Sequence, residues 1–164
     1  MSNHAELNRI VSLLDDLQQG ECWIGNNAEQ VLNGIDAKTA AKKGYDGGNS
    51  IWQLVHHITF WRKHVVKRIE KGMELPFEGP EFYQPPNPSE ESWNETVQDF
   101  KAAYHLLREA ILSMDGKKLD QPLEGEGIQY TYYKQIMGVM QHDAWHLGQI
   151  ILIRKMHAVQ GANS

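Results

Sequence analysis

Residues 50–72 read SIWQLVHHITFWRKHVVKRIEKG, and this stretch predicts a long amphipathic helix. Its apolar residues recur at three- and four-residue spacing, which places them on one face of a helix. They are Ile51, Leu54, Val55, Ile58, Val65 and Ile69. Paired glycines precede the stretch as a turn, Asn49 or Ser50 can cap the helix, and Gly72 ends it. The stretch therefore predicts one wall of a helical core.

Three other segments show the same helical spacing, and they complete a bundle. They span about residues 3–19, 90–114 and 132–157. A short helical piece is expected at 27–35, and residues 73–89 hold five of the six prolines and must be loop. No segment alternates apolar and polar residues long enough to predict a strand. We therefore expect an all-α fold, a four-helix bundle with long connections that forms one domain over residues 1–164.

Composition excludes several classes of protein. The net charge is −5 without a basic block, which disfavours binding to nucleic acid and to anionic membranes. No apolar run approaches the roughly 18 residues of a membrane span, and the N-terminus MSNHAELNRIVSLL lacks the features of a secretory signal. The lone Cys22 cannot form an internal disulfide, which fits a reducing compartment. We expect a soluble cytoplasmic protein with neither nucleic acid nor membrane as a partner.

Two of the eight histidines lie one helical turn apart. His142 and His146 are four residues apart on the flank of the last apolar stripe, and Gln149 lies on the same flank. Neutral imidazoles at this spacing can chelate one cation. The alternative reading is a pair of half-buried histidines at the edge of the core, bonded to neighbouring carbonyl groups.

A third ligand has to come from another helix. His57 flanks the stripe of residues 50–72, whereas His56 points about 100° away and is expected to face solvent. His64 lies two turns beyond His57, about 10 Å along the axis, which is too far for the same ligand shell. We expect His64 to line the pocket together with Trp61. The other histidines, His4, His105 and His157, have no such geometry.

Three imidazoles would leave positions open for water or substrate, as in a catalytic site, since structural zinc sites are normally closed by four ligands. Asp143 lies near the middle of an apolar stripe, where a carboxylate needs a partner. It can accept a hydrogen bond from a ligand imidazole, receive the indole N–H of a tryptophan, or bond to the backbone at a helix junction. The sequence leaves these roles open.

Three segments resemble the DinB-like superfamily of small metal-binding helical bundles. They are WIG…VLNGI at 23–35, GGNSIWQLVHHITFWR at 47–62 and QHDAWHLGQI at 141–150. The resemblance covers nearly the whole chain in the same helix order. It implies a site for one divalent metal ion (zinc, nickel or iron) at His57, His142 and His146, commonly in a homodimer.

The resemblance also implies candidate reactions. Characterised relatives include S-transferases that use low-molecular-weight thiols, so we expect a metal-dependent enzyme acting with such a thiol on a small-molecule substrate. The first alternative is a metal-dependent hydrolase, because HDAWH resembles HExxH with Asp143 in place of the Glu base. The second is a metal- or ligand-binding stress protein without turnover. Trp52 and Trp145 lie off the main stripes and are expected either at a subunit interface or under the long connections.

Overall fold

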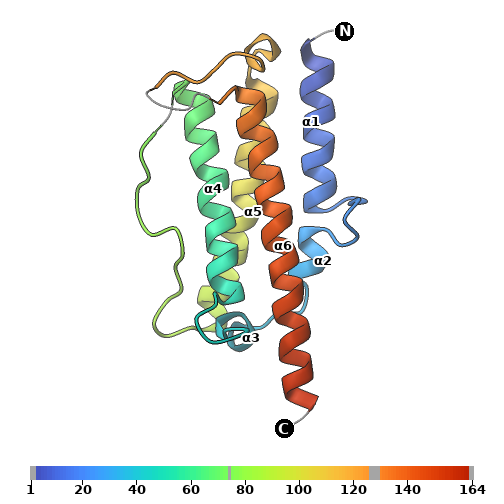
Figure 1. The fold of residues 1–164 in the computed structure, drawn as a ribbon, viewed down its shortest axis with the longest axis vertical. Coiled ribbons are helices and arrows are strands. Elements are labelled where there is room, and N and C mark those ends of the chain that lie inside the picture. Colours follow the sequence, from blue (N-terminus) through green and yellow to red (C-terminus); the bar gives the residue numbers. More distant parts are fainter. Residues whose placement is uncertain (1–2, 74, 126–129, 163–164) are drawn as a thin grey trace.

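The structure is a computed structural model that describes residues 3–73, 75–125 and 130–162. Four long helices lie side by side and form a bundle (Figure 1). They are α1 (Asn3–Gln18), α4 (Ile51–Lys71), α5 (Glu90–Ser113) and α6 (Tyr132–Ala162). Three shorter elements lie in the connections: α2 (Ala28–Leu32), α3 (Ala37–Ala41) and the 3₁₀ turn η1 (Gly116–Lys118). The part of the chain that the structure describes contains no strand, which confirms the all-α prediction.

The order of the helices follows from one long crossover. In Figure 1, α4 and α5 run upward whereas α1 and α6 run downward, so α4 and α5 are parallel. The segment that joins them therefore returns along the whole length of α4, where Figure 1 shows it as a light green trace beside the bundle. We call residues 75–89 of this segment the strap. The strap is the proline-rich loop that the sequence predicts.

Local signals fix the ends of the central helices. Ser50 and Ser89 each form a capping box, in which the cap side chain accepts from the third backbone N–H of the helix. Gly72 ends α4 in the left-handed conformation, with φ of 73°, which glycine adopts without steric strain. The helix α3 was not predicted, and α6 continues five residues beyond the predicted end at His157.

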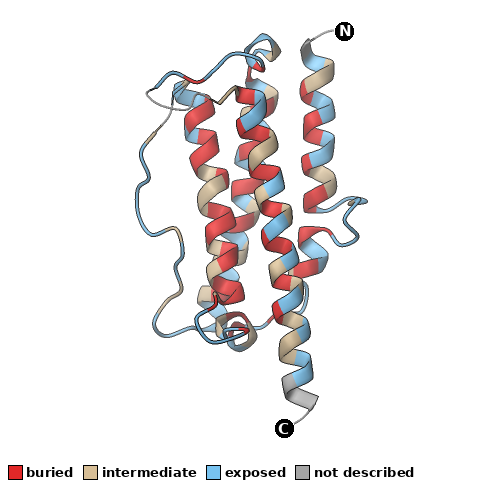
Figure 2. Ribbon diagram, in the orientation of Figure 1, coloured by how far each residue is buried: buried red, intermediate tan, exposed pale blue. Residues whose placement is uncertain are grey.

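The core lies where the four long helices face one another, and Figure 2 shows buried residues along these inner faces. Fully buried members include Leu14, Val55, Ile58, Leu107, Ile111, Ile136, Leu147 and Ile150. Each side chain of this size contributes about 1.5–3 kcal/mol when it leaves water. The core therefore joins all four helices without help from an ion. No helix within the described ranges is long and apolar enough to cross a membrane.

The two tryptophans singled out from the sequence have different environments. Trp52 is only 1% exposed and packs against Trp93, with ring centroids 5.1 Å apart. The indole N–H of Trp93 donates to the backbone carbonyl of Ile35. Trp52 therefore packs inside the chain beneath the connection before α4, and an interface role for it is wrong. Trp145 is 65% exposed on α6.

Candidate metal centre

Three histidines from two neighbouring helices converge in one cluster. His57 lies on α4, and His142 and His146 lie one turn apart on α6. The Nε2 atom of His142 is 3.0 Å from that of His57 and 3.1 Å from that of His146. The three donor atoms all lie within 4.8 Å of one another. The structure thus brings together the three histidines that the sequence predicts as ligands.

The spacing of these nitrogens fits a single metal ion. Zinc binds histidine nitrogens at about 2.0–2.1 Å, so two nitrogens on one ion at 90–110° lie about 2.9–3.4 Å apart. The two short separations in this site fall within that range. Two of the three separations therefore already suit one ion, and all three nitrogens lie within 4.8 Å of one another.

The Nδ1 atoms of His142 and His146 face acceptor side chains outside the cluster, which leaves their Nε2 atoms facing inward. His146 donates from Nδ1 to the Oε1 atom of Gln149 over 2.7 Å, and the Nδ1 atom of His142 lies 3.5 Å from the Oδ1 atom of Asp143. The hydrogen on Nδ1 leaves the Nε2 lone pair directed into the cluster. Converging lone pairs repel one another unless a cation lies between them. The Nε2 lone pairs are therefore directed as a metal ion requires of its ligands.

Burial keeps two of the imidazoles neutral. Desolvation, followed by the nearby His142 and His146, lowers the pKa of His57 from 6.5 to about 4. Desolvation is also the main cause that lowers the pKa of His146, although its hydrogen bond to Gln149 opposes the effect. A neutral imidazole is the form that binds a metal. At neutral pH these two ligands are therefore ready to coordinate.

Asp143 has a partner that sequence reasoning missed. Its Oδ2 atom lies 2.7 Å from the Nε atom of Arg62 on α4, and both side chains are completely buried. Arg62 also donates to Gln18 of α1 over 3.0 Å and lies over the ring of Phe100 at 4.3 Å. A sequence signal existed, because Arg62 and Asp143 are opposite charges that each interrupt an apolar stripe. Asp143 is thus held by Arg62 through Oδ2, while its Oδ1 atom faces the Nδ1 atom of His142.

Of the two remaining predicted pocket residues, Trp61 lines the cavity beside the cluster, whereas His64 lines a separate cavity, so the expectation that they share one pocket is wrong. Trp61 lies beside the histidines, with its ring centroid 5.7 Å from that of His142. His64 is buried between Phe60 and Phe77, outside the cluster, and desolvation lowers its pKa. His56 is half-buried rather than solvent-facing, because the strap covers it.

Two cavities flank α4. The first has a volume of about 730 Å³ and adjoins the histidine cluster, since His142 and Trp61 line it. Aromatic and aliphatic side chains form most of its wall, with Arg68 and Lys134 also present. The His142 side chain is 22% exposed, whereas His57 and His146 are almost fully covered. The cluster is therefore accessible mainly from the side of His142.

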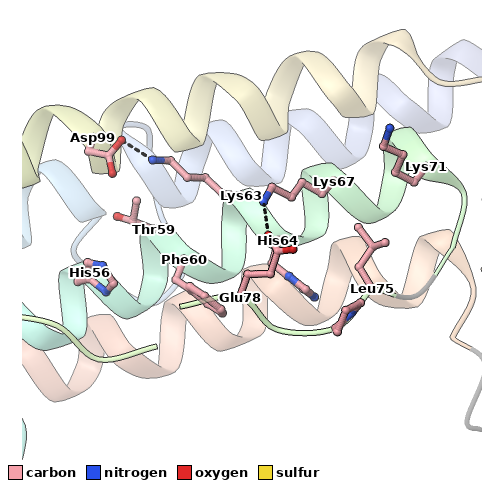
Figure 3. Close-up of a pocket in the computed structure, with 11 residues that line it drawn as sticks. His56, Thr59, Phe60, Lys63, His64, Lys67, Lys71, Leu75, Glu78 and Asp99 are labelled. Atoms are coloured by element: carbon pink, nitrogen blue, oxygen red, sulfur yellow. Dashed lines mark hydrogen bonds and ion pairs between the residues drawn. The ribbon is translucent and has the colours of Figure 1, made fainter. Parts of the chain in front are cut away.

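The second cavity, of about 530 Å³, lies on the other side of α4 under the strap (Figure 3). Lys63 and Lys67 line it, and they pair with Asp99 of α5 and Glu78 of the strap, as the dashed lines in Figure 3 mark. Because its charges are largely paired and His57, His142 and His146 do not line it, this cavity is separate from the cluster.

The fold and the cluster define a class of protein, a helical bundle with three histidines on two facing helices that can hold a metal ion. A family model described as the DinB superfamily matches residues 23–150. The chain belongs to the DinB superfamily. Comparison with curated proteins gives no match.

Proposed function

We propose that this protein binds one divalent metal ion, zinc, nickel or iron, through the Nε2 atoms of His57, His142 and His146. We propose further that it is an enzyme in which a low-molecular-weight thiol attacks an electrophilic small molecule. The observation that carries the proposal is the convergence of three nitrogen donors beside a cavity of about 730 Å³. Cavities of this size hold small-molecule ligands.

In the proposed reaction the ion would make a thiol or water ligand more acidic, and the chain would hold the ion and the substrate in position. A divalent ion bound by three neutral imidazoles lowers the pKa of a thiol or water ligand and so supplies a nucleophile near neutral pH. The chain holds the donors on two packed helices, and Trp61 and His142 form the wall where a substrate would lie.

One observation favours thiol transfer over hydrolysis. A hydrolase of the HExxH type needs a carboxylate free to accept a proton from water. Asp143 occupies that sequence position, but its carboxylate is completely buried against Arg62. A thiol is already acidic enough to ionise on a metal without such a base. The resemblance to thiol-dependent relatives supports the same choice, and the lone Cys22 is consistent with a cytoplasm that keeps thiols reduced.

We also propose a homodimer formed through the outward face of α6. Trp145, Leu152 and Val159 are more than half exposed there. Their seven-residue spacing places them along one stripe of the helix. An exposed apolar stripe of this kind usually marks an interface, and a second copy related by a two-fold axis presents the same stripe.

The test of the proposed reaction uses protein purified without a nickel column, because such a column supplies nickel to a three-histidine site. Its metal is identified by elemental analysis, and conjugation of bacillithiol to a model electrophile is measured before and after chelation. We expect metal-dependent conjugation that is lost in His142→Ala and retained in His56→Ala. Thiol-independent ester cleavage would favour the hydrolase, and bound metal without either activity would favour a binding protein.

A further inference from the structure

His57 differs from the other two histidines in the surroundings of its outer nitrogen. Gln149 and Asp143, both on α6, approach the Nδ1 atoms of His146 and His142. The Nδ1 atom of His57 is buried and makes no hydrogen bond of good geometry with the residues that the structure describes, although the backbone of Glu81 lies close enough to raise its pKa slightly. A carboxylate of the strap lies close to it: the Oε2 atom of Glu81 is 3.8 Å away.

The strap is fixed against α4 at Glu81 and at the residues that follow it. The backbone carbonyl of Glu81 accepts from the Nδ1 atom of His56 over 3.2 Å. The next residue, Phe82, stacks on the ring of His57 with centroids 4.0 Å apart and planes only 9° from parallel. Further along, Ser50 donates to the side chain of Gln84. These contacts hold Glu81 beside His57.

We propose that Glu81 is a positioning residue of the metal site, whose carboxylate accepts the Nδ1–H hydrogen bond of His57. The proposal rests on the metal binding proposed above. A shift of about 1 Å would bring the two atoms to the 2.7–2.9 Å of a charge-assisted hydrogen bond. The strap is then part of the metal site.

Two consequences follow for the ion. An acceptor on Nδ1 fixes the tautomer and orientation of the ring and makes Nε2 a stronger donor. The charge of Glu81 also offsets part of the charge of a divalent cation held by neutral imidazoles. Asp143 is less able to do so, because Arg62 already neutralises it.

The matched control lies in the same strap. Glu78 is a second glutamate of the strap, more exposed than Glu81; it faces Lys67 at 3.6 Å and lines the separate cavity under the strap (Figure 3). Glu81→Ala, Glu81→Gln and Glu78→Ala are compared with the unaltered chain. Zinc affinity is measured by competition with a chelator, and the melting temperature of each metal-free protein shows whether folding has changed.

We expect Glu81→Ala to weaken zinc binding about 10- to 100-fold, as removal of such outer partners does. Glu81→Gln should recover most of the affinity because its amide oxygen still accepts, and Glu78→Ala should bind as the unaltered chain does. In the zinc-loaded protein, ¹⁵N NMR should show the Nδ1–H tautomer of His57, and Glu81→Ala should shift the Nδ1 resonance.

Three results would overturn the inference. Equal affinities of Glu81→Ala and Glu78→Ala would mean that the strap carboxylate does not position His57, and that the backbone carbonyl of Glu81 suffices. Equal losses in Glu81→Ala and Glu81→Gln would contradict the acceptor role. If the unaltered chain binds no zinc, nickel or iron, the proposed function itself fails, which is a different result from unchanged binding in Glu81→Ala.

Discussion

The Nε atom of Arg62 lies 2.7 Å from the Oδ2 atom of Asp143, and neither side chain is exposed to solvent. The pair joins α4 to α6 directly next to His142. Arg62 extends the connection to α1 through Gln18. A buried ion pair of this kind holds its helices in one relative position, because a slip along either axis would leave a charge without a partner.

Arg62→Met should destabilise the metal-free protein by about 3–5 kcal/mol, since it leaves the buried carboxylate uncompensated. Urea unfolding followed by circular dichroism measures this change. The control is Arg108→Met, which removes a half-exposed pair with Asp15 and should cost about 1 kcal/mol or less. A loss in Arg62→Met no larger than in Arg108→Met would contradict the structural importance of the pair.

Single replacement of His57, His142 or His146 by Ala should reduce metal content to near zero or weaken affinity by several orders of magnitude. Each change removes one of three converging donors. His56→Ala is the matched control, because its ring bonds to the strap backbone and not to the cluster. Metal content by elemental analysis and affinity by titration give the answer. Loss of metal in His56→Ala alone would show that the neighbouring histidine is the ligand.

Removal of the metal by a chelator should leave the bundle folded. The buried apolar core joins all four long helices without contribution from the three histidines. Helical content by circular dichroism should therefore be unchanged. Adding metal at 100 times its dissociation constant should raise the free energy of unfolding by about 2.7 kcal/mol through linkage. Unfolding on chelation would instead identify the ion as structural.

Stability should fall at high pH through Tyr104. Its hydroxyl donates to the Oδ1 atom of Asp15 over 2.6 Å, and burial followed by this carboxylate raises the pKa of Tyr104 from 10.0 to about 12. The unfolded chain loses the Tyr104 proton near pH 10, whereas the folded protein retains it. The contribution of Tyr104 to the free energy of unfolding is therefore complete below pH 10 and is lost as the pH rises through about 12.

Tyr104→Phe should lower the free energy of unfolding by about 1–2 kcal/mol at neutral pH. It should also reduce the fall in that free energy between pH 10 and 12. Urea unfolding at a series of pH values measures both effects. Tyr133→Phe, an exposed position on α6, is the control and should leave the profile unchanged. An unaltered decline in Tyr104→Phe would assign the effect to other groups.

Light scattering should give a mass twice the 18.8 kDa of the chain at micromolar concentration. Trp145→Glu or Leu152→Glu should shift the protein to monomer, because a charge buried in an apolar interface lacks a partner. Leu106→Glu, on the exposed side of α5, should not change the mass. A monomer in the unaltered chain would rule out the dimer.

The long helices could be predicted because their signals are local. The caps at Ser50 and Ser89 and the apolar stripes depend only on neighbouring residues. The helical wheel also distinguished His57 from His56. The five-residue α3 was missed because it is too short for periodicity to appear.

Features that depend on contacts between distant segments were harder to predict. The partnership of Arg62 with Asp143 depends on how α4 and α6 rotate against each other. Glu81 and Phe82 lie in a loop without periodicity, so nothing local places them beside His57. The burial of Trp52 likewise depends on the position of Trp93, 41 residues later in the sequence.

The prolines of the strap have a thermodynamic consequence for the site that the strap covers. Pro76, Pro80, Pro85, Pro86 and Pro88 all lie within it. Each proline ring fixes one backbone torsion, which reduces the number of conformations available to the segment in the unfolded chain. Ordering the strap over His57 therefore costs less conformational entropy than ordering a proline-free loop of equal length. The strap is then largely preorganised before a ligand binds, so more of the free energy of the ligand's contacts is available for affinity.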